Sequence, residues 1–413
     1  MDNSLLKFAK KVKRKKFGSN GSSSKREDCV RFAMYLAGWD RARAERTVDH
    51  AKNDLGIPYG EYVRFELPLV PENELSERHQ ERLQALRTVQ KNNDAKYLNE
   101  VVEITGMSRD EAVEKMTHAQ DLTGASFENY RYYEFWKLDD EQQKTYYTKG
   151  DVKRLKAKYN RDSIVRYELN TKDVFNRRFE KYLGRPWMLT EDMDRDSFRS
   201  VFGAESRIMF KPTKGTAGAG IRIYDLNEDN IDSVYDEIAG SQEGIVEGFL
   251  KQHRDMCRFS VNAVNTIRLV TVMTQDENAG IEPNKVHFLY AGLRMGVGDQ
   301  FVDNMHCGGL TAVIDLETGR LATDGINYRN EVFEKHPDTG ETIKGSEIPC
   351  FREMIEMISS AGLIMPGFVG WDIAISENGP VIIEANTSPG TGVLQTPYAL
   401  EGRGMRHVIE KYL

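Results

Sequence analysis

Three oxygen-bearing side chains near the end of the chain, those of Asp372, Glu384 and Asn386, have the types and spacing of a metal site. They lie in two apolar, β-branched runs on either side of Glu377-Asn378-Gly379, a pattern that predicts a β-hairpin. Side chains alternate between the faces of a strand, so a hairpin can bring all three onto one face. Two carboxylates and an amide oxygen suit Mg²⁺, completed by water and phosphate oxygens, better than Zn²⁺. A solvated polar face with an asparagine-rich turn is the alternative interpretation.

The loop of this hairpin decides whether the three side chains meet. We expect a three-residue loop, Glu377 to Gly379, with Gly379 in the left-handed conformation. That loop pairs Asp372 with Glu384, Ala374 with Ile382, and Gly370 with Asn386. A two-residue Asn-Gly loop would instead place Asp372 and Glu384 on opposite faces. The magnesium hypothesis therefore depends on the longer loop.

A glycine-rich segment, Met209 to Asp225, carries Gly215, Gly218 and Gly220 after an expected strand that ends at Lys211. It is not a P-loop, because no Gly-Lys-Ser/Thr follows the glycines. It is not a dinucleotide fingerprint either, because the residues after Gly220 alternate as in a strand. The order strand, glycine loop, strand suits a cover over a triphosphate, to which backbone N–H groups and Lys211 can be presented. Taken alone, the segment also fits an ordinary glycine-rich turn.

Two further segments add charged residues to this half of the chain. Asn170-Thr171-Lys172-Asp173 opens an expected helix and supplies a second lysine, Lys172. Residues 244–250, GIVEGFL, predict a strand that leads from Ile245 into Glu247 and ends near Leu250. A crossing segment of this kind can present Glu247 and backbone groups to the edge of an adenine.

In their order and spacing, these four motifs resemble the ATP-grasp superfamily over about residues 165–413. The resemblance implies an α+β fold in which two subdomains grip ATP, with Mg²⁺ as its companion ion. It implies that the phosphates bind Lys172, Lys211 and the loop of Gly215, Gly218 and Gly220. It further implies that Glu247 contacts adenine beside Leu250, that Asp255 is the candidate for the ribose, and that Asp372, Glu384 and Asn386 hold Mg²⁺.

A middle segment narrows the resemblance. Ala291 to Gly309, AGLRMGVGDQFVDNMHCGG, is similar to the Arg…Asn-x-His-x-Gly-Gly segment of α-glutamate ligase-like proteins. Together with Asn265-Thr266-Ile267-Arg268 it resembles the sugar-transfer-associated and teichuronopeptide-type ATP-grasp proteins. Arg268 and Arg294 are the candidates for holding a substrate carboxylate and the tetrahedral intermediate, and each could equally be a structural arginine.

The resemblance implies an ATP-dependent carboxylate–amine ligase that releases ADP and forms an amide through an acyl phosphate. We expect cell-surface polysaccharide or natural-product biosynthesis as its setting, with small-molecule substrates such as a sugar acid and an amino acid. An ATP-grasp kinase that stops at a phosphorylated product is the second interpretation. A nucleotide-binding regulatory protein without turnover is the third.

The rest of the chain sets the domain prediction: a basic tail and linker over 1–24, a helical accessory domain over 25–138, a connector over 139–164, and the ATP-grasp domain over 165–413. The helical part contains a weak repeat, in which the segment from Gly38 recurs from Gly106 and a capping box is expected at Ser108 and Glu111. The basic tail fits either peripheral contact with an anionic membrane or a disordered segment.

Composition and net charge limit the classes of protein to which the chain can belong. Four cysteines without paired spacing, and no apolar run of membrane-spanning length, favour a cytoplasmic protein with reduced thiols. A net charge of −7 argues against general nucleic-acid binding.

Overall fold

The computed structural model describes residues 26–27, 29–31, 34, 41–53, 77–160, 169, 171–212, 220–241, 243–260, 262–299, 303, 305 and 308–413. The chain forms two compact units. The first comprises Met1–Lys96 and Asp162–Tyr167, and it holds helix α3 (Arg41–Asn53) and the first part of α5 (Glu77–Thr105). The second comprises Tyr97–Arg161 and Glu168–Leu413, and it holds every strand of the described chain. The expected basic tail, residues 1–24, lies outside the described residues.

The larger of two antiparallel sheets in the second unit has the strand order β11-β10-β5-β6-β7-β8-β9. Its strands are β5 (Thr266–Met273), β6 (His287–Met295), β7 (Leu310–Ile314), β8 (Gly325–Ile326), β9 (Val332–Phe333), β10 (Gly367–Ser376) and β11 (Gly379–Asn386). Every residue of β10 is buried, because helices or loops cover both of its faces. This strand, second from the edge of the sheet, carries Asp372, whose carboxylate is buried.

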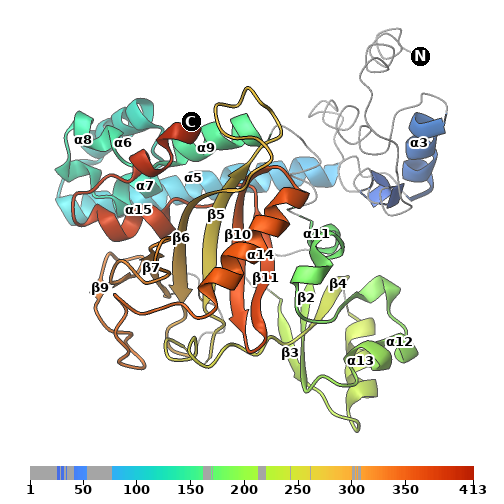
Figure 1. Ribbon diagram of the computed structural model, residues 1–413. Helices are drawn as coiled ribbons and strands as arrows, with labels where there is room; N and C mark the ends of the chain where they lie inside the picture. Colours follow the sequence, from blue (N-terminus) through green and yellow to red (C-terminus); the bar gives the residue numbers. More distant parts are fainter. Residues whose placement is uncertain are drawn as a thin grey trace. The chain divides into compact units, whose positions relative to one another are not determined.

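The smaller sheet has the order β1-β4-β2-β3 and lies beside the β11 edge of the larger one (Figure 1). Its strands are β1 (Trp187–Leu189), β2 (Arg207–Pro212), β3 (Arg222–Asp225) and β4 (Gly244–Gly248). Helices α12 (Arg195–Phe202) and α13 (Ile231–Ala239) pack on it through Phe198, Phe202, Ile231 and Ile238. The two predicted strands are confirmed, because β2 pairs with β3 in an antiparallel manner, and the residues between them, 213–219, lie outside the described residues.

Helices α9 (Lys149–Tyr159), α14 (Phe351–Ile364) and α15 (Gly392–Ala399) contact the larger sheet. Helices α6 (Arg109–Thr123), α7 (Phe127–Tyr132) and α8 (Asp140–Lys144) gather beside α15 (Figure 1). Short 3-10 turns lie at Phe135–Lys137, Glu180–Tyr182, Thr190–Asp192, Arg406–Val408 and Glu410–Tyr412. Tyr147, Val152 and Leu155, around and within α9, share one core with Val270 and Phe368 of the sheet.

The second copy of the sequence repeat forms α6 and α7. Ser108 caps α6 by accepting a hydrogen bond from the Glu111 N–H, and Gly124 ends the helix in the left-handed conformation. The Glu111 side chain pairs with Lys115 at 3.0 Å. In the first copy α3 begins at Arg41, the counterpart of Arg109, whereas Gly56 and Tyr62 lie outside the described residues. No helix among the described residues is long and apolar enough to cross a membrane.

The β10–β11 hairpin confirms the predicted pairing of Asp372 with Glu384 and of Gly370 with Asn386. The predicted loop is wrong, because Ser376 pairs directly with Gly379 and leaves only Glu377 and Asn378 in the turn. The predicted pairing of Ala374 with Ile382 is also wrong, since Ala374 faces Val381. A bulge between Asp372 and Ile373 takes up the extra residue and restores the register before Glu384.

Candidate functional site

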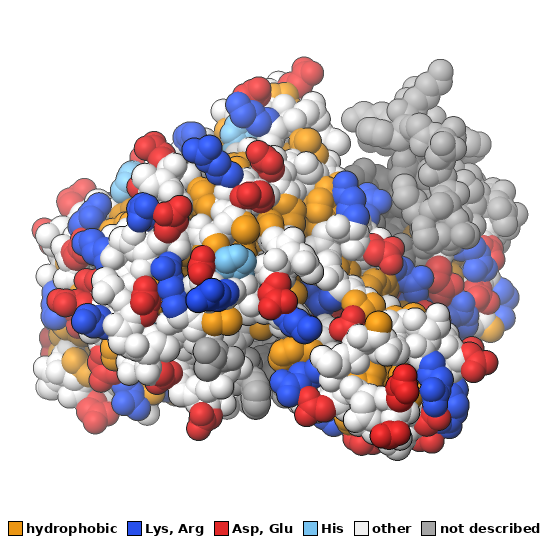
Figure 2. Space-filling view, turned by 60° about the horizontal axis from the view of Figure 1, so that its bottom comes forward, with side chains coloured by type: hydrophobic (Ala, Val, Ile, Leu, Met, Phe, Trp, Pro, Cys, Tyr) orange, Lys and Arg blue, Asp and Glu red, His pale blue; other side chains and the backbone are white. Residues whose placement is uncertain are grey.

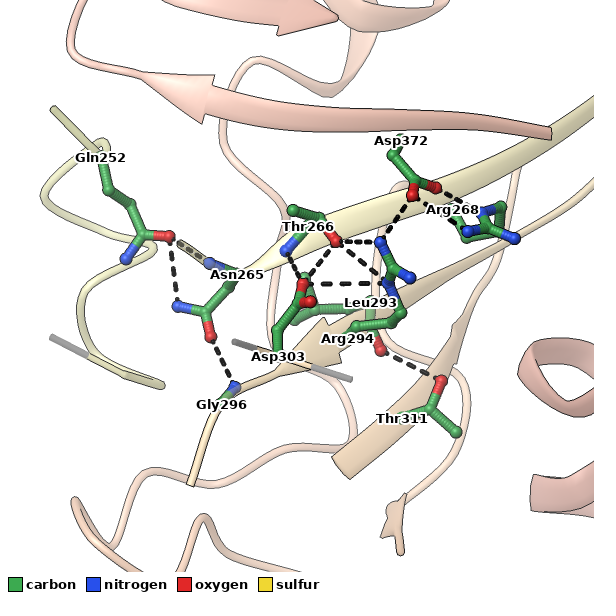
Figure 3. Close-up of polar contacts among 10 residues, drawn as sticks. All are labelled: Gln252, Asn265, Thr266, Arg268, Leu293, Arg294, Gly296, Asp303, Thr311 and Asp372. Atoms are coloured by element: carbon green, nitrogen blue, oxygen red, sulfur yellow. Dashed lines mark hydrogen bonds and ion pairs between the residues drawn. The ribbon is translucent and has the colours of Figure 1, made fainter. Parts of the chain in front are cut away.

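Asp372 lies at the centre of a network of charged side chains drawn from three strands (Figure 3). Arg268 of β5 donates from Nε to Oδ1 and from Nη2 to Oδ2, the latter over 2.9 Å. Arg294 of β6 donates from Nη2 to Oδ2 over 2.8 Å. Burial of this carboxyl opposes its ionisation, but the charges of Arg294 and Arg268 outweigh that effect and lower the pKa of Asp372 to about 2.

Arg294 is itself held by a second pair of polar residues. Its Nε and Nη2 donate to the Thr266 hydroxyl over 3.0 and 2.6 Å. That hydroxyl donates in turn to the carboxylate of Asp303, which also accepts the Thr266 N–H over 2.8 Å. Burial raises the pKa of Asp303, and its Oδ2 lies 3.8 Å from Arg294 Nε. The Arg294 guanidinium is therefore fixed from two sides (Figure 3).

Glu384 and Asn386 lie on β11, across the hairpin from Asp372 and Gly370. Glu384 keeps contact with solvent, yet partial desolvation by the surrounding protein and the charge of Asp372 raise its pKa. Desolvation is the larger of these two effects, and the repulsion from Asp372 adds to it. The described residues contain no group of three or more His, Cys, Asp and Glu side chains that could hold a metal, so the amide of Asn386 would have to be the third donor.

The donor set fits Mg²⁺ by its chemistry, because all three side chains offer oxygen. Three N–H groups already donate to Asp372, two of them to Oδ2. A carboxylate has about four lone-pair positions, so roughly one remains, on Oδ1. Glu384 accepts none of these N–H groups.

A second charged cluster lies on the smaller sheet, around Glu247 of β4. Lys211 of β2 donates to its Oε2 over 2.6 Å, and Arg185 Nε donates to the same oxygen over 3.0 Å. Asn176 of α11 (Lys172–Phe179) donates to Oε1 over 3.3 Å. Burial disfavours the ionised form of Glu247, but the charges of Arg185 and Lys211 prevail and hold its pKa well below the usual range.

Lys172 begins α11, as the sequence predicted, and its Nζ donates to the Pro212 carbonyl over 3.3 Å. Burial and the nearby positive charge of Lys211 lower its pKa, while Glu384 and Glu247 act in the opposite direction. The charges of Lys211 and Glu247 on the smaller sheet and of Glu384 on the larger sheet therefore all act on Lys172. An anion placed between the two lysines would relieve their repulsion.

The other predicted site residues are placed as follows. Gly220 has the positive φ of 78° that favours glycine, whereas Gly215 and Gly218 lie outside the described residues. Leu250 follows β4 and is half-buried. Asp255 lies exposed on the turn after β4, where its charge acts on Cys350. Among the described residues, no hydrogen bond or ion pair joins Asp255 to Lys172 or Lys211.

Sequence reasoning missed Arg185, Asp303 and the hydroxyl of Thr266 as members of these networks. Thr266 and Asp303 lie in the same segments as Arg268 and Arg294, and their residue types alone do not distinguish them from structural polar residues. Arg185 gave no signal, since it lies in a short Leu-Gly-Arg-Pro stretch without periodicity.

Two antiparallel sheets with helices packed on them make an α+β fold, in which Lys211 comes from the smaller sheet, Lys172 from the start of α11, and Asp372 and Glu384 from the larger sheet. Residues 153–412 match the family model described as sugar-transfer associated ATP-grasp, and the chain belongs to this family. No curated protein matches the chain.

Solved structures similar to the chain include D-alanyl-alanine synthetase A from Vibrio cholerae, with a TM-score of 0.35, 14% identity, and coverage of 60% of this chain and 64% of that one. The ATP-grasp ligase PsnB with its minimal precursor has a TM-score of 0.33 and 14% identity, with 60% and 59% covered. D-alanine–D-alanine ligase from Bacillus anthracis has a TM-score of 0.33 and 14% identity, with 61% and 68% covered. The chain thus spans about three fifths of the first two.

Proposed function

We propose that this protein is an ATP-dependent carboxylate–amine ligase that forms an amide through an acyl phosphate and releases ADP. The observation that carries the proposal is that Lys172, beside Lys211, lies within electrostatic reach of Glu384, which relates a phosphate-binding side to a carboxylate side. A protein that only bound nucleotide would not need the second side. The family description supports a substrate connected with sugar transfer, such as a sugar acid, and an amino acid suits the amine.

In the proposed site Lys172 and Lys211 bind the phosphates of ATP, and Glu247 orients Lys211. Asp372, Glu384 and Asn386 would hold Mg²⁺, which when bound offsets charge on the phosphoryl oxygens. Nη1 of Arg268 and of Arg294 takes part in none of their hydrogen bonds to Asp372 and Thr266, so we infer that these atoms face the reacting groups. Those N–H groups can bind a substrate carboxylate and the oxyanion that forms from it.

The reaction balances in two steps. A carboxylate oxygen of the substrate attacks the γ-phosphorus, the bond to the β-phosphate oxygen breaks, and ADP leaves. The amine nitrogen then attacks the acyl carbon, inorganic phosphate leaves with its bond pair, and the nitrogen loses a proton. The described residues place no obvious base at the site, and positioning by the two arginines would supply most of the second step.

The decisive experiment uses ATP, Mg²⁺, pooled uronic acids carrying ¹⁸O in the carboxylate, and pooled amino acids. The proposal expects an amide product and one ¹⁸O atom in the released inorganic phosphate. A phosphorylated acid without free phosphate would favour the kinase interpretation. Absence of ADP release with every pool, from protein that ATP stabilises against heat, would contradict the ligase.

The kinase remains the second candidate because the first step is common to both reactions. What favours the ligase is the pair of guanidinium groups held beside Asp372, since a phosphoryl transfer alone develops no oxyanion at the acyl carbon.

A further inference from the structure

Arg185 contacts both sheets of the second unit with one buried guanidinium. Its side chain is 5% exposed, and its Nη2 lies 3.0 Å from Glu247 Oε2. Nη1 donates to the carbonyl of Leu183 over 3.0 Å and to that of Ile382 over 3.2 Å. Glu247 belongs to β4 of the smaller sheet, and Ile382 belongs to β11 of the larger one.

The contact between Arg185 and Ile382 is important because Ile382 lies close to Glu384 on β11. Ile382 pairs with Ile373 directly beside the bulge, and Glu384 follows two residues later on the same strand. At its other end Arg185 binds the same Glu247 oxygen that receives Lys211. The path from the phosphate-binding lysine to the carboxylate strand therefore runs through Glu247 and Arg185, each of them almost fully buried.

The residue before Arg185 allows the close approach. Gly184 has a φ of 61°, and a Cβ added there would lie 2.3 Å from Cγ1 of Val381. Only glycine both adopts this conformation readily and leaves room for β11. The Leu183-Gly184-Arg185 turn is thus pressed against the strand at Val381, which brings the Arg185 fork within reach of the next carbonyl.

We propose that Arg185 is a positioning residue that fixes the strand bearing Glu384 relative to the Lys211–Glu247 pair. This inference rests on the proposed nucleotide and magnesium site. It adds the residue that sets the distance between the Lys211–Glu247 pair and the strand of Glu384. Arginine suits the task because its planar fork donates in several directions at once, whereas a lysine at this position could keep the charge but not the carbonyl contacts.

The test separates nucleotide binding from the metal-dependent part of binding. The melting temperature is measured with ATP in EDTA and with ATP plus Mg²⁺, because each ligand that binds the native state stabilises it. We expect Arg185→Lys to keep most of the shift given by ATP in EDTA, since both phosphate lysines remain. The further shift given by Mg²⁺ should fall by half or more, and ADP release should fall at least about tenfold with the KM for ATP little changed.

The matched control is Arg177→Lys, the same exchange on the exposed face of α11, where Arg177 pairs with Asp192. It should leave both shifts and the rate at their wild-type values. Gly184→Ala tests the same idea without altering the guanidinium, because its new Cβ pushes β11 away at Val381. Gly184→Ala combined with Val381→Ala removes the clashing Cγ1 and should restore much of the Mg²⁺-dependent shift.

Arg185→Lys with a wild-type Mg²⁺-dependent shift and wild-type ADP release per folded molecule would overturn the positioning role. A loss of melting temperature alone, with both ligand shifts intact, would overturn it as well and leave a purely structural contact. If the wild-type protein showed no shift with ATP, the proposed nucleotide site would fail and this inference with it. If Arg185→Lys did not fold, the pair of Gly184 variants would decide the matter by the presence or absence of restoration.

Discussion

The carboxylate of Asp372 is shared by two guanidinium groups before any substrate arrives. Arg268 and Arg294 keep it ionised despite its burial, so the group needs no proton loss on binding a cation. The same contacts restrict its rotation, because both oxygens are engaged. This preorganisation suits a site in which charges must be placed before the reaction begins.

Glu384→Gln tests the magnesium hypothesis at the level of one atom. The change keeps the shape of the side chain and removes a charge that Asp372 repels, so we expect the melting temperature to stay within a few degrees or to rise slightly. ADP release should fall by orders of magnitude, because the metal would no longer offset charge on the transferring phosphoryl group. Both quantities are measured on the same preparation.

The control for this variant is Glu377→Gln, on the exposed turn of the same hairpin. It should change neither quantity. If Glu384→Gln released ADP at the wild-type rate, Glu384 would be removed from the site, and the hairpin would then be only a structural element.

His336 makes stability depend on pH in a predictable direction. It is buried, its Nε2 donates to the Gly296 carbonyl over 2.9 Å, and its Nδ1 accepts the Asp338 N–H at 3.4 Å. Burial lowers its pKa, although the Gly296 contact and the charge of Asp338 oppose the shift. The unfolded chain therefore binds the proton more readily, and stability is lost as the pH falls below about 6.5, by at most about 1.4 kcal/mol per pH unit.

Urea unfolding at pH 7.5 and pH 5.5 measures this effect. His336→Gln can keep the donor to Gly296 and cannot titrate, so its free energy of unfolding should fall less than that of the wild type over the same interval. Equal losses in the two proteins would show that His336 does not contribute.

At the scale of elements, the β10–β11 hairpin shows how far the sequence could predict. The apolar alternation on either side of Glu377-Asn378-Gly379 indicated the two strands, and the facing pair Asp372 and Glu384 followed from it. The sequence could not show where the odd residue would be placed, since a longer loop and a bulge give the same pairing at Asp372. The energy difference between those two solutions depends on packing against β5, which has no local signal.

Gly379 is the position at which this turn should be most sensitive to substitution. Its φ is 109°, which side chains rarely adopt, while an added Cβ would meet nothing within 4 Å. Gly379→Ala should therefore cost about 1–3 kcal/mol through backbone strain alone. Gly390→Ala is the control, because Gly390 has equally open surroundings without a positive φ. The melting temperature of this variant should barely differ from that of the wild type.

Some residues of the candidate site could be predicted from the sequence, and others could not, because their contacts are long-range. Lys172, Lys211, Glu247, Asp372 and Glu384 belong to motifs that are contiguous in sequence, and the structure brings their charges together. Arg185 binds partners 62 and 197 residues away, and Thr266 binds Asp303 over 37 residues. Contacts at such separations depend on the fold as a whole, so spacing in the chain does not indicate them.

At the scale of the whole molecule, the helices of residues 97–161 are part of the same compact unit as both sheets. Tyr133 and Asn129 of this region contact the Thr391 hydroxyl over 2.5 and 3.2 Å, five residues after Asn386. The second copy of the repeat therefore supports the loop that leaves the proposed metal strand. The predicted domain boundary near residue 138 remains a prediction.

Two truncations test which part of α5 this unit requires. A chain that begins at Glu77 should keep the melting temperature and the shift with ATP, because the core residues Tyr97, Leu98 and Val101 remain. A chain that begins at Gly106 loses these side chains, each worth about 1.5–3 kcal/mol of burial, and the Glu100–Arg131 ion pair. Its thermal transition by circular dichroism should fall by tens of degrees or disappear, and equal transitions in the two fragments would contradict this division.

The pairing of cations with carboxylates around the site also bears on how a nucleotide arrives. Arg268 and Arg294 share Asp372, while Lys211 and Arg185 share Glu247, so most positive charge has a negative neighbour about 3 Å away. On the face shown in Figure 2, acidic and basic side chains are interspersed in the same manner. Charges so matched produce only a short-range field, and diffusional encounter gains little from electrostatic steering. The association rate of ATP should accordingly change by only a few-fold between 50 and 300 mM salt. The proposed site would then bind nucleotide at nearly the same rate at low and at high ionic strength.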